Sequence, residues 1–355
     1  MGSKAARLTI LSVLGTRPEV IQTAALSSAI GSSMREVLVN TGQHYDANMD
    51  ADQIADTGLA TPAYNLAIGE SPKPPVELAR TKLCSIIRRE RPTAVLVRGD
   101  TYSTLAGARA ACDSGIPLIH VEAGLRSFRA EMPEEQNRIE VDHLSDLLLA
   151  PTLHAKGNLE REGVCGSVHL TGDVLFDMLL RWRDRLPAST ECSPYALATI
   201  HRSATTDDRD RLVEAFACLG SIPFRVIVLL HPRTKARLRE GRIDIPPNVE
   251  LRDPVPYTQM LVLERDARVI VTDSGGVQRE AYAWGVPCIT LRDETEWVET
   301  VELGWNALVG LDQVRLAEAL ERPLPVVRPP VLGDGHASAR IIRTIEDFLR
   351  SESAP

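Results

Sequence analysis

VIVTDSGGVQRE, residues 269–280, contains a short apolar strand, two adjacent glycines and the beginning of a helix. A buried strand that turns through glycine into a helix is typical of a parallel α/β sheet. The unbonded N–H groups at such a helix start suit phosphate oxygens, and Glu280 is placed to accept hydrogen bonds from ribose hydroxyls. The alternative, an ordinary N-capped helix, would need neither Gly275 nor Gly276.

The same alternation of strand and helix extends over the rest of the chain. Apolar, β-branched runs occur at 8–14, 36–40, 94–97, 118–121, 147–150 and 168–170, and again at 195–199, 225–230, 249–251, 269–271 and 287–291. Such runs indicate parallel sheets with helices on both faces. We therefore predict an α/β fold with two doubly wound, Rossmann-like domains whose strand ends face a central cleft.

The length of 355 residues fits two domains. We predict an N-terminal domain over 1–175 and a C-terminal domain over 176–335, with the hinge near the charged segment 177–194. After the Pro-rich stretch 323–330, apolar residues on a helical period predict a last helix within 336–355. Such a helix often packs back on an earlier domain, here with the N-terminal one as the candidate.

Composition and charge narrow the class of protein. The net charge is −8, with basic residues dispersed among acidic ones, so no nucleic-acid partner is expected. No apolar run approaches the ~20 residues that span a bilayer, and the chain start lacks a signal-peptide pattern. We expect a cytoplasmic protein without a membrane partner. Six scattered cysteines, none at C-x-x-C spacing, are expected to be reduced and mostly buried.

A second candidate anion site follows the first strand in GTRPE, residues 15–19. Gly15 permits a tight turn, Pro18 suits the start of a helix, and Arg17 adds a guanidinium that can bind an anion with two donors. A simple surface role for Arg17 is the alternative.

Three carboxylates are predicted to lie at one edge of the first sheet. Asp100 follows the strand 94–97, Glu122 follows the strand 118–121, and Glu134 lies at the start of a helix. Like charges in proximity raise a carboxyl pKa and suit general acid and base catalysis. For Glu134 the alternative is stabilisation of the helix dipole. In the second half His201 follows a strand end, where a lone histidine is more often structural.

Taken together, these segments resemble the non-hydrolysing UDP-N-acetylglucosamine 2-epimerase family over nearly the whole chain. The matching motifs are GTRPE (15–19), TGQH (41–44), RGDT (98–101), HVEAGLR (120–126), PEEQNR (133–138), HR (201–202), DSGGVQRE (273–280), RDETE (292–296) and GDGHAS (333–338). The resemblance implies a glycosyltransferase-B-like fold. It also implies inversion at C2 of the sugar by anti elimination of UDP to 2-acetamidoglucal and re-addition of UDP, with no metal or redox cofactor.

The resemblance assigns roles by position. The implied catalytic residues are Asp100, Glu122, Glu134 and His201, and the implied substrate-binding residues are Arg17, Gln22, Arg138, Arg202, Ser274, Gly275, Gly276, Glu280, Thr295 and Glu296. Gln43 and His231 are candidates for an allosteric site that binds a second substrate molecule. The implied partners are a UDP-sugar substrate and a second copy of the chain in a homodimer.

Some positions depart from the family pattern. Gln22 stands where the family often has lysine, Ala204 stands in a run that is commonly more polar, and Trp297 replaces an arginine found in some members. These departures leave the nucleotide and sugar preference open. The alternatives are a hydrolysing epimerase that releases N-acetylmannosamine and UDP, a glycosyltransferase of the same fold, and a catalytically idle sugar-nucleotide sensor.

Overall fold

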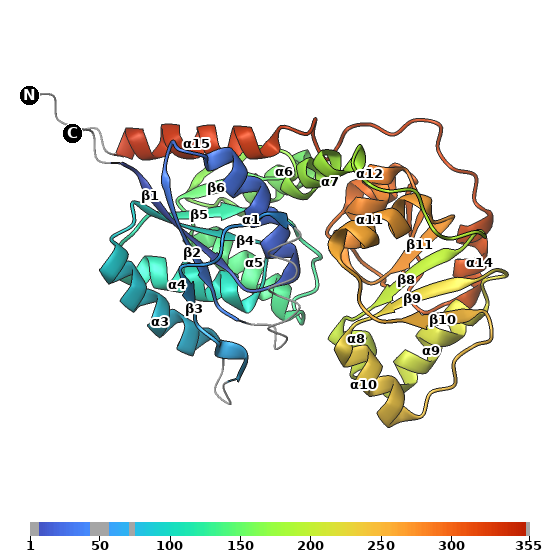
Figure 1. The fold of residues 1–355 in the computed structure, drawn as a ribbon. Helices are drawn as coiled ribbons and strands as arrows, with labels where there is room; N and C mark the ends of the chain where they lie inside the picture. Colours follow the sequence, from blue (N-terminus) through green and yellow to red (C-terminus); the bar gives the residue numbers. More distant parts are fainter. Residues whose placement is uncertain (1–6, 43–56, 71–74, 353–355) are drawn as a thin grey trace, which may run out of the picture. The chain divides into compact units, whose positions relative to one another are not determined.

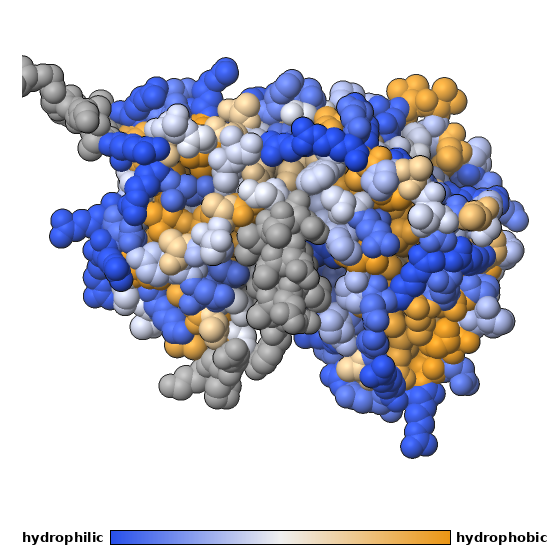
Figure 2. Space-filling view, viewed as in Figure 1, coloured by the Kyte–Doolittle hydropathy of each residue, from blue (hydrophilic) through white to orange (hydrophobic). Residues whose placement is uncertain are grey.

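The computed structural model describes residues 7–42, 57–70 and 75–352. The chain divides into two compact units. The first comprises Met1–Met178 and Val331–Pro355, and the second comprises Leu179–Pro330. Within the described residues no helix is long and apolar enough to cross a bilayer. Figure 2 shows polar and apolar residues interspersed over the visible face.

The first unit contains a parallel sheet of seven strands in the order β3-β2-β1-β4-β5-β6-β7 (Figure 1). Its strands are β1 Thr9–Leu14, β2 Arg35–Asn40, β3 Tyr64–Asn65, β4 Ala94–Arg98, β5 Leu118–Val121, β6 Leu147–Ala150 and β7 Ser167–Leu170. Its helices are α1 Arg17–Ile30, η1 Ile68–Glu70, α3 Pro75–Glu90, α4 Tyr102–Ser114, α5 Pro133–Leu144, α6 Leu153–Glu162 and α15 Ala337–Glu352, and α7 Val174–Arg183 continues into the second unit.

The second unit contains a parallel sheet of six strands in the order β10-β9-β8-β11-β12-β13. Its strands are β8 Ala196–Ile200, β9 Val226–Leu230, β10 Val249–Arg252, β11 Val269–Thr272, β12 Cys288–Thr290 and β13 Asn306–Leu308. Its helices are α8 Ser203–Thr206, α9 Arg209–Gly220, α10 Pro232–Gly241, α11 Tyr257–Asp266, α12 Gly275–Trp284, α13 Val298–Glu302 and α14 Gln313–Glu321.

Each sheet is packed on both faces because its strands are apolar on both sides. In the first unit α3, α4 and α5 bury one face of the sheet, and α1 and α15 pack together on the other (Figure 1). In the second unit α9, α10 and α14 cover one face and α11 and α12 the other. Two doubly wound α/β domains were predicted, and this fold class is confirmed.

A buried carboxylate fixes the start of α15, with which the chain joins the first unit again. Asp177 in α7 accepts hydrogen bonds from the backbone N of Ala337 (3.1 Å) and Ser338 (2.7 Å) at the start of α15. A carboxylate at this point satisfies N–H groups that have no partner within the helix. On the apolar side of α15, Ile341 and Ile345 are fully buried.

Each sheet contains one topological switch point, at which the strand order reverses. The order reverses between β1 and β4 in the first unit and between β8 and β11 in the second. At such a point the loops after the two neighbouring strands run to opposite faces and leave a crevice at the carboxyl ends, where ligands of open α/β sheets bind. Of the motifs that the sequence singled out, GTRPE, RGDT, HR and DSGGVQRE follow these four strands.

The prediction for the cysteines is wrong in one respect. All six are free thiols, but only Cys218 and Cys288 are buried. Cys112, Cys165 and Cys192 are exposed, because they lie near helix ends and in connecting segments rather than on the apolar faces.

Candidate active site

In the first unit a buried carboxylate ties together the turns after β1 and β4. Glu19 is 2% exposed. One of its oxygens accepts hydrogen bonds from the backbone N of Gly15 (2.8 Å) and Thr16 (2.7 Å), and the other accepts from the hydroxyls of Thr101 (2.7 Å) and Thr104 (3.0 Å). Burial raises the pKa of Glu19 more than these hydrogen bonds and Arg98 lower it. The two turns are therefore held as one piece.

Gly15 is required by close packing at this turn. A Cβ at this position would collide with the side-chain oxygens of Ser103 and Thr41. Arg17, the first residue of α1, is half-buried at the helix start. The turn thus places Arg17 next to the reversal point, while the backbone N–H groups of Gly15 and Thr16 donate to Glu19. The anion site at GTRPE stays a prediction.

Asp100 and Glu122 follow the neighbouring strands β4 and β5. Arg138 forms an ion pair with Asp100, whose side chain is 25% exposed, and Asn137 donates a hydrogen bond to the carbonyl oxygen of Asp100 at 2.8 Å. Gln22 donates a hydrogen bond to Glu122. Both carboxylates therefore lie at the carboxyl edge of the sheet, and each is held by a different donor.

Glu122 has a left-handed backbone, with φ of +69°. Such a conformation is uncommon for a residue with a Cβ and persists only where the surroundings impose it. Here Leu149 of β6 accepts hydrogen bonds from the backbone N of Glu122 (3.1 Å) and Ala123 (3.2 Å). The neighbouring strand thereby fixes the direction in which the carboxylate leaves the sheet.

Glu134 is half-buried in the first turn of α5, and Arg138 follows one turn later on the same helix. Residues four apart on a helix share a face. Since Arg138 is paired with Asp100, α5 presents Glu134 on the side that faces the end of β4.

In the second unit His201 and Asp273 form a hydrogen-bonded pair after β8 and β11. His201 Nδ1 lies 3.1 Å from a carboxylate oxygen of Asp273, and Asp273 also accepts from the backbone N of His201 and Arg202. Burial would raise the pKa of Asp273, but the charge and hydrogen bond of His201, with these backbone N–H groups, hold it below its ordinary value. The pair orients the imidazole, which is 38% exposed.

α12 begins with the two glycines of the DSGGVQRE motif. Ser274 caps the helix by accepting a hydrogen bond from Val277 N at 3.4 Å. Gly275 and Gly276 form the first turn, and a helix start of this kind favours anions. On the next turn Glu280 accepts a hydrogen bond from the hydroxyl of Tyr257 at 3.0 Å.

The UDP-N-acetylglucosamine 2-epimerase family model matches residues 29–346, most of the chain. The chain belongs to this family. A Methanococcus maripaludis protein named UDP-N-acetylglucosamine 2-epimerase homolog is 39% identical, over 96% of this chain and 100% of that protein. The UDP-2,3-diacetamido-2,3-dideoxy-D-glucuronate 2-epimerase of Pseudomonas aeruginosa is also 39% identical, over 94% of this chain and 98% of its own.

A solved structure of the family superposes closely. The Methanocaldococcus jannaschii UDP-GlcNAc 2-epimerase, in complex with UDP-GlcNAc and UDP, has a TM-score of 0.87 and 36% identity, covering 96% of this chain and 99% of that one. The predicted resemblance to UDP-N-acetylglucosamine 2-epimerases is confirmed, and the chain is an epimerase.

Two predicted binding residues of this epimerase are deeply engaged with other side chains. Thr295 donates to Gln278 at 2.6 Å. The carboxylate of Glu296 accepts hydrogen bonds from both terminal nitrogens of Arg292, at 3.0 and 3.1 Å. A terminal nitrogen of Arg202 lies 3.6 Å from the same carboxylate. A Cβ on Gly275 would lie 3.5 Å from Glu296, so this neutralised carboxylate lies beside the start of α12.

Trp297, a departure from the family pattern, is buried in the same place. It is 2% exposed, and the guanidinium of Arg279 lies over its ring at 4.7 Å from the centroid. The indole therefore packs under the start of α12, since a Cβ on Gly275 would lie 3.4 Å from its Nε1.

The two candidate allosteric residues differ in what the structure says of them. Gln43 lies outside the described residues. His231 caps α10 by accepting a hydrogen bond from Arg233 N at 3.2 Å, and its ring centroid lies 6.2 Å from that of His201. His231 is therefore a neighbour of a predicted catalytic residue.

Sequence reasoning about this epimerase missed the residues that orient the predicted ones. Asp273 was read only as part of a phosphate motif, Tyr257 was given no role, and the contact between Gln22 and Glu122 was not foreseen. For Asp273 a signal existed, because adjacent parallel strands bring the residues after β8 and β11 together. For Gln22 no local signal existed, because 100 residues separate it from Glu122.

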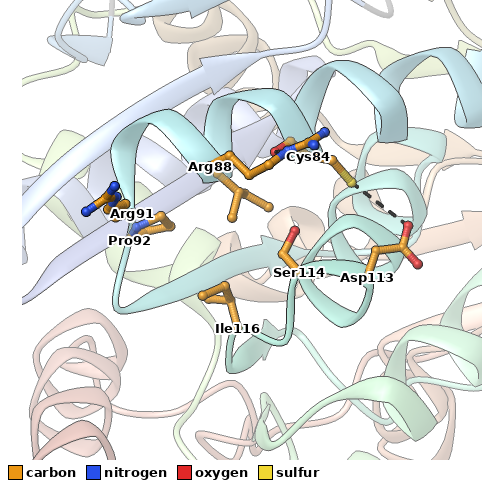
Figure 3. Close-up of a pocket in the computed structure, with 8 residues that line it drawn as sticks. Cys84, Arg88, Arg91, Pro92, Asp113, Ser114 and Ile116 are labelled. Carbon is orange, nitrogen blue, oxygen red and sulfur yellow. Dashed lines mark hydrogen bonds between the residues drawn. The ribbon is translucent and has the colours of Figure 1, made fainter.

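A separate cavity of about 560 Å³ lies away from these residues (Figure 3). It is lined by Cys84, Arg88, Arg91, Asp113 and neighbouring residues at the ends of α3 and α4. These segments precede β4 and β5, so the cavity lies at the amino edge of the sheet, opposite Asp100. It brings together none of the predicted site residues.

Proposed function

We propose that this epimerase interconverts UDP-N-acetylglucosamine and UDP-N-acetylmannosamine without net hydrolysis. The observation that carries the proposal is the pair of carboxylates on neighbouring strand ends, Asp100 beside Arg138 and Glu122 beside Gln22. Epimerisation at C2 needs one group that removes a proton and another that returns one to the opposite face. Two separately held carboxylates suit that requirement.

The proposed first step is an anti elimination. The C1–O bond breaks and its electron pair leaves with UDP, while a carboxylate takes the C2 proton and the C–H pair forms the C1=C2 bond of 2-acetamidoglucal. The C2 proton is weakly acidic, so departure of UDP must lead or accompany its removal. The N-terminus of α12 and the imidazole of His201 suit stabilisation of the negative charge on the diphosphate.

In the proposed second step a proton returns to C2 from the face opposite to the one it left. A protonated carboxyl group gives its proton to C2 from the opposite side, and a phosphate oxygen of UDP adds to C1. Glu134 is proposed as the third member of this acid and base set. Arg17, Ser274, Gly275, Gly276 and Glu280 are proposed to bind the UDP moiety.

Deuterium exchange tests this function. UDP-N-acetylglucosamine is incubated with the purified protein in deuterated water, and the C2 proton and the phosphorus signals are followed by NMR. We expect UDP-N-acetylmannosamine with deuterium at C2 and no accumulation of UDP. Free UDP with N-acetylmannosamine would assign the hydrolysing reaction instead, and an unchanged spectrum would overturn epimerisation of this substrate.

A second candidate is the same reaction on a UDP-2,3-diacetamido-2,3-dideoxy-D-glucuronate. It is favoured by the 39% identity to the Pseudomonas aeruginosa enzyme of that name. A parallel incubation with this sugar nucleotide decides between the two, because both reactions introduce deuterium at C2. Exchange with the diacetamido uronate alone would assign it as the substrate.

A further inference from the structure

Glu135 is a buried carboxylate of the PEEQNR motif to which neither the family resemblance nor the proposed reaction gives a role. It is 1% exposed in the first turn of α5, next to Glu134. An ionised carboxylate in such a place is costly unless donors surround it. Its two oxygens meet donors from a nearby turn and from α5 itself.

The first group of donors comes from the turn that follows HVEAGLR. Glu135 accepts hydrogen bonds from Ser127 N at 2.9 Å, from Ser127 Oγ at 3.0 Å and from Phe128 N at 2.8 Å. Phe128 has a left-handed backbone with φ of +58°, and the residue is 68% exposed. The carboxylate of Glu135 therefore stabilises a turn in which Phe128 has a backbone conformation that is unfavourable for residues other than glycine.

The second donor is Arg138, which lies between two carboxylates. One terminal nitrogen donates to Glu135 at 2.8 Å, and the other is paired with Asp100. The Arg138 side chain is only 6% exposed. Because a guanidinium is planar and rigid, fixing one of its nitrogens fixes the direction of the others.

We propose that Glu135 is a positioning residue that acts on Asp100 through Arg138. Glu135 orients the guanidinium, and the guanidinium orients the carboxylate of Asp100, whose carbonyl oxygen is held in turn by Asn137 of the same helix. Its other hydrogen bonds fix the turn at 127–128 to the same group. This inference rests on the proposed role of Asp100 in epimerisation.

Glu135→Gln tests the inference by its effect on turnover. The amide keeps the shape but turns an N–H group toward donors and loses the charge that holds Arg138. Displacement of a reacting group by about 1 Å can cost about 100-fold in rate, so we expect kcat to fall about 10- to 100-fold, with KM changed less than about threefold. Glu140→Gln is the matched control, because Glu140 lies on the same helix and pairs with Arg109 at the surface. It should turn over like the unmodified protein.

A double-mutant cycle separates positioning from general support of the fold. If Glu135 acts through Asp100, Glu135→Gln should slow C2 exchange by less than about threefold in an Asp100→Asn background, because residues that act as a unit are non-additive. A full 10- to 100-fold further loss there would overturn the inference, as would an unchanged kcat in the single variant. If Glu135→Gln does not fold, Glu135→Asp serves in its place, because the shorter carboxylate cannot reach both Arg138 and the turn.

The guanidinium of Arg138 supplies a readout that needs no turnover. Its N–H protons, assigned with Arg138→Lys, should exchange slowly with water in the unmodified protein and at least tenfold faster in Glu135→Gln. Equal exchange in both would overturn the inference. If the unmodified protein exchanges C2 of neither sugar nucleotide, the proposed function fails, while the exchange of these N–H protons still shows whether Glu135 holds Arg138.

Discussion

Gln22 is the residue at which this epimerase departs from its family and still contacts a predicted catalytic group. Its side chain is 2% exposed and donates a hydrogen bond to Glu122. Lysine, which the resemblance to the family leads us to expect at this position, can donate in the same direction and adds a charge. A neutral donor thus preserves the orientation of the carboxylate while leaving its charge uncompensated by this neighbour.

Removing that donor should slow the reaction without weakening the binding of UDP. In Gln22→Met an apolar chain of similar size leaves Glu122 without the hydrogen bond, and bonds to charged groups contribute about 1.5–3 kcal/mol. We expect kcat for C2 exchange to fall about 10- to 100-fold, since 1.36 kcal/mol corresponds to about tenfold. Gln22→Lys retains a donor and should stay within about fivefold of the unmodified protein. Equal rates for the Met variant and the unmodified protein would show that Gln22 does not position Glu122.

At the scale of elements, a buried charge cluster joins α5 to the end of β5. Asp142 of α5 lies 2.7 Å from His120 Nδ1 and 2.7 Å from Arg126, and accepts a hydrogen bond from Gly124 N at 3.0 Å. Burial would raise the pKa of Asp142, but the charge and hydrogen bond of His120, followed by those of Arg126, lower it below the ordinary value. The cluster holds the backbone immediately after Glu122.

Asp142→Asn should destabilise the fold and remove part of its acid sensitivity. Breaking a buried pair costs about 3–5 kcal/mol, or roughly 6–20 °C in Tm for a unit of this size. Because the folded-state pKa is depressed, the contribution of Asp142 is fully present above its unfolded pKa of about 3.9 and is lost as pH falls through the lower folded value. Thermal unfolding from pH 7 to pH 3 measures both effects. The difference in stability between the two proteins should shrink below about pH 4, whereas Glu140→Gln should show no comparable difference at pH 7.

Most of the strands could be predicted from the sequence because they are continuous apolar runs, which is the pattern of a sheet buried on both faces. β3 and β13 were not predicted, because they contain only Tyr64–Asn65 and Asn306–Leu308 and lie at sheet edges. The motifs located the catalytic candidates because each motif is a short contiguous segment that directly follows or overlaps such a strand or begins a helix. Their partners depend on tertiary contacts rather than on a local pattern. Asp142 reaches His120 from the helix α5, and Asp273 meets His201 because β8 and β11 pair.

At the scale of the whole molecule, the predicted roles divide between the two units. The proposed UDP-binding residues Ser274, Gly275, Gly276 and Glu280 lie in the second unit, with Arg17 as the exception. The acid and base carboxylates lie in the first. We therefore expect UDP alone to affect the residues that bind the nucleotide, and the intact sugar nucleotide to affect the acid and base carboxylates as well.

Amide hydrogen exchange with two ligands checks this division. Saturating UDP at about 100 times its Kd stabilises the bound state by about 2.7 kcal/mol, so we expect slower exchange at the start of α12, over 275–278. The acid and base loops, 99–101 and 122–124, should gain protection only with the intact sugar nucleotide, because the sugar is what their carboxylates are proposed to meet. If UDP alone protected these loops as strongly as α12, the nucleotide rather than the sugar would be the ligand of the first unit. The assignment of Asp100 and Glu122 to proton transfer at C2 would then be wrong.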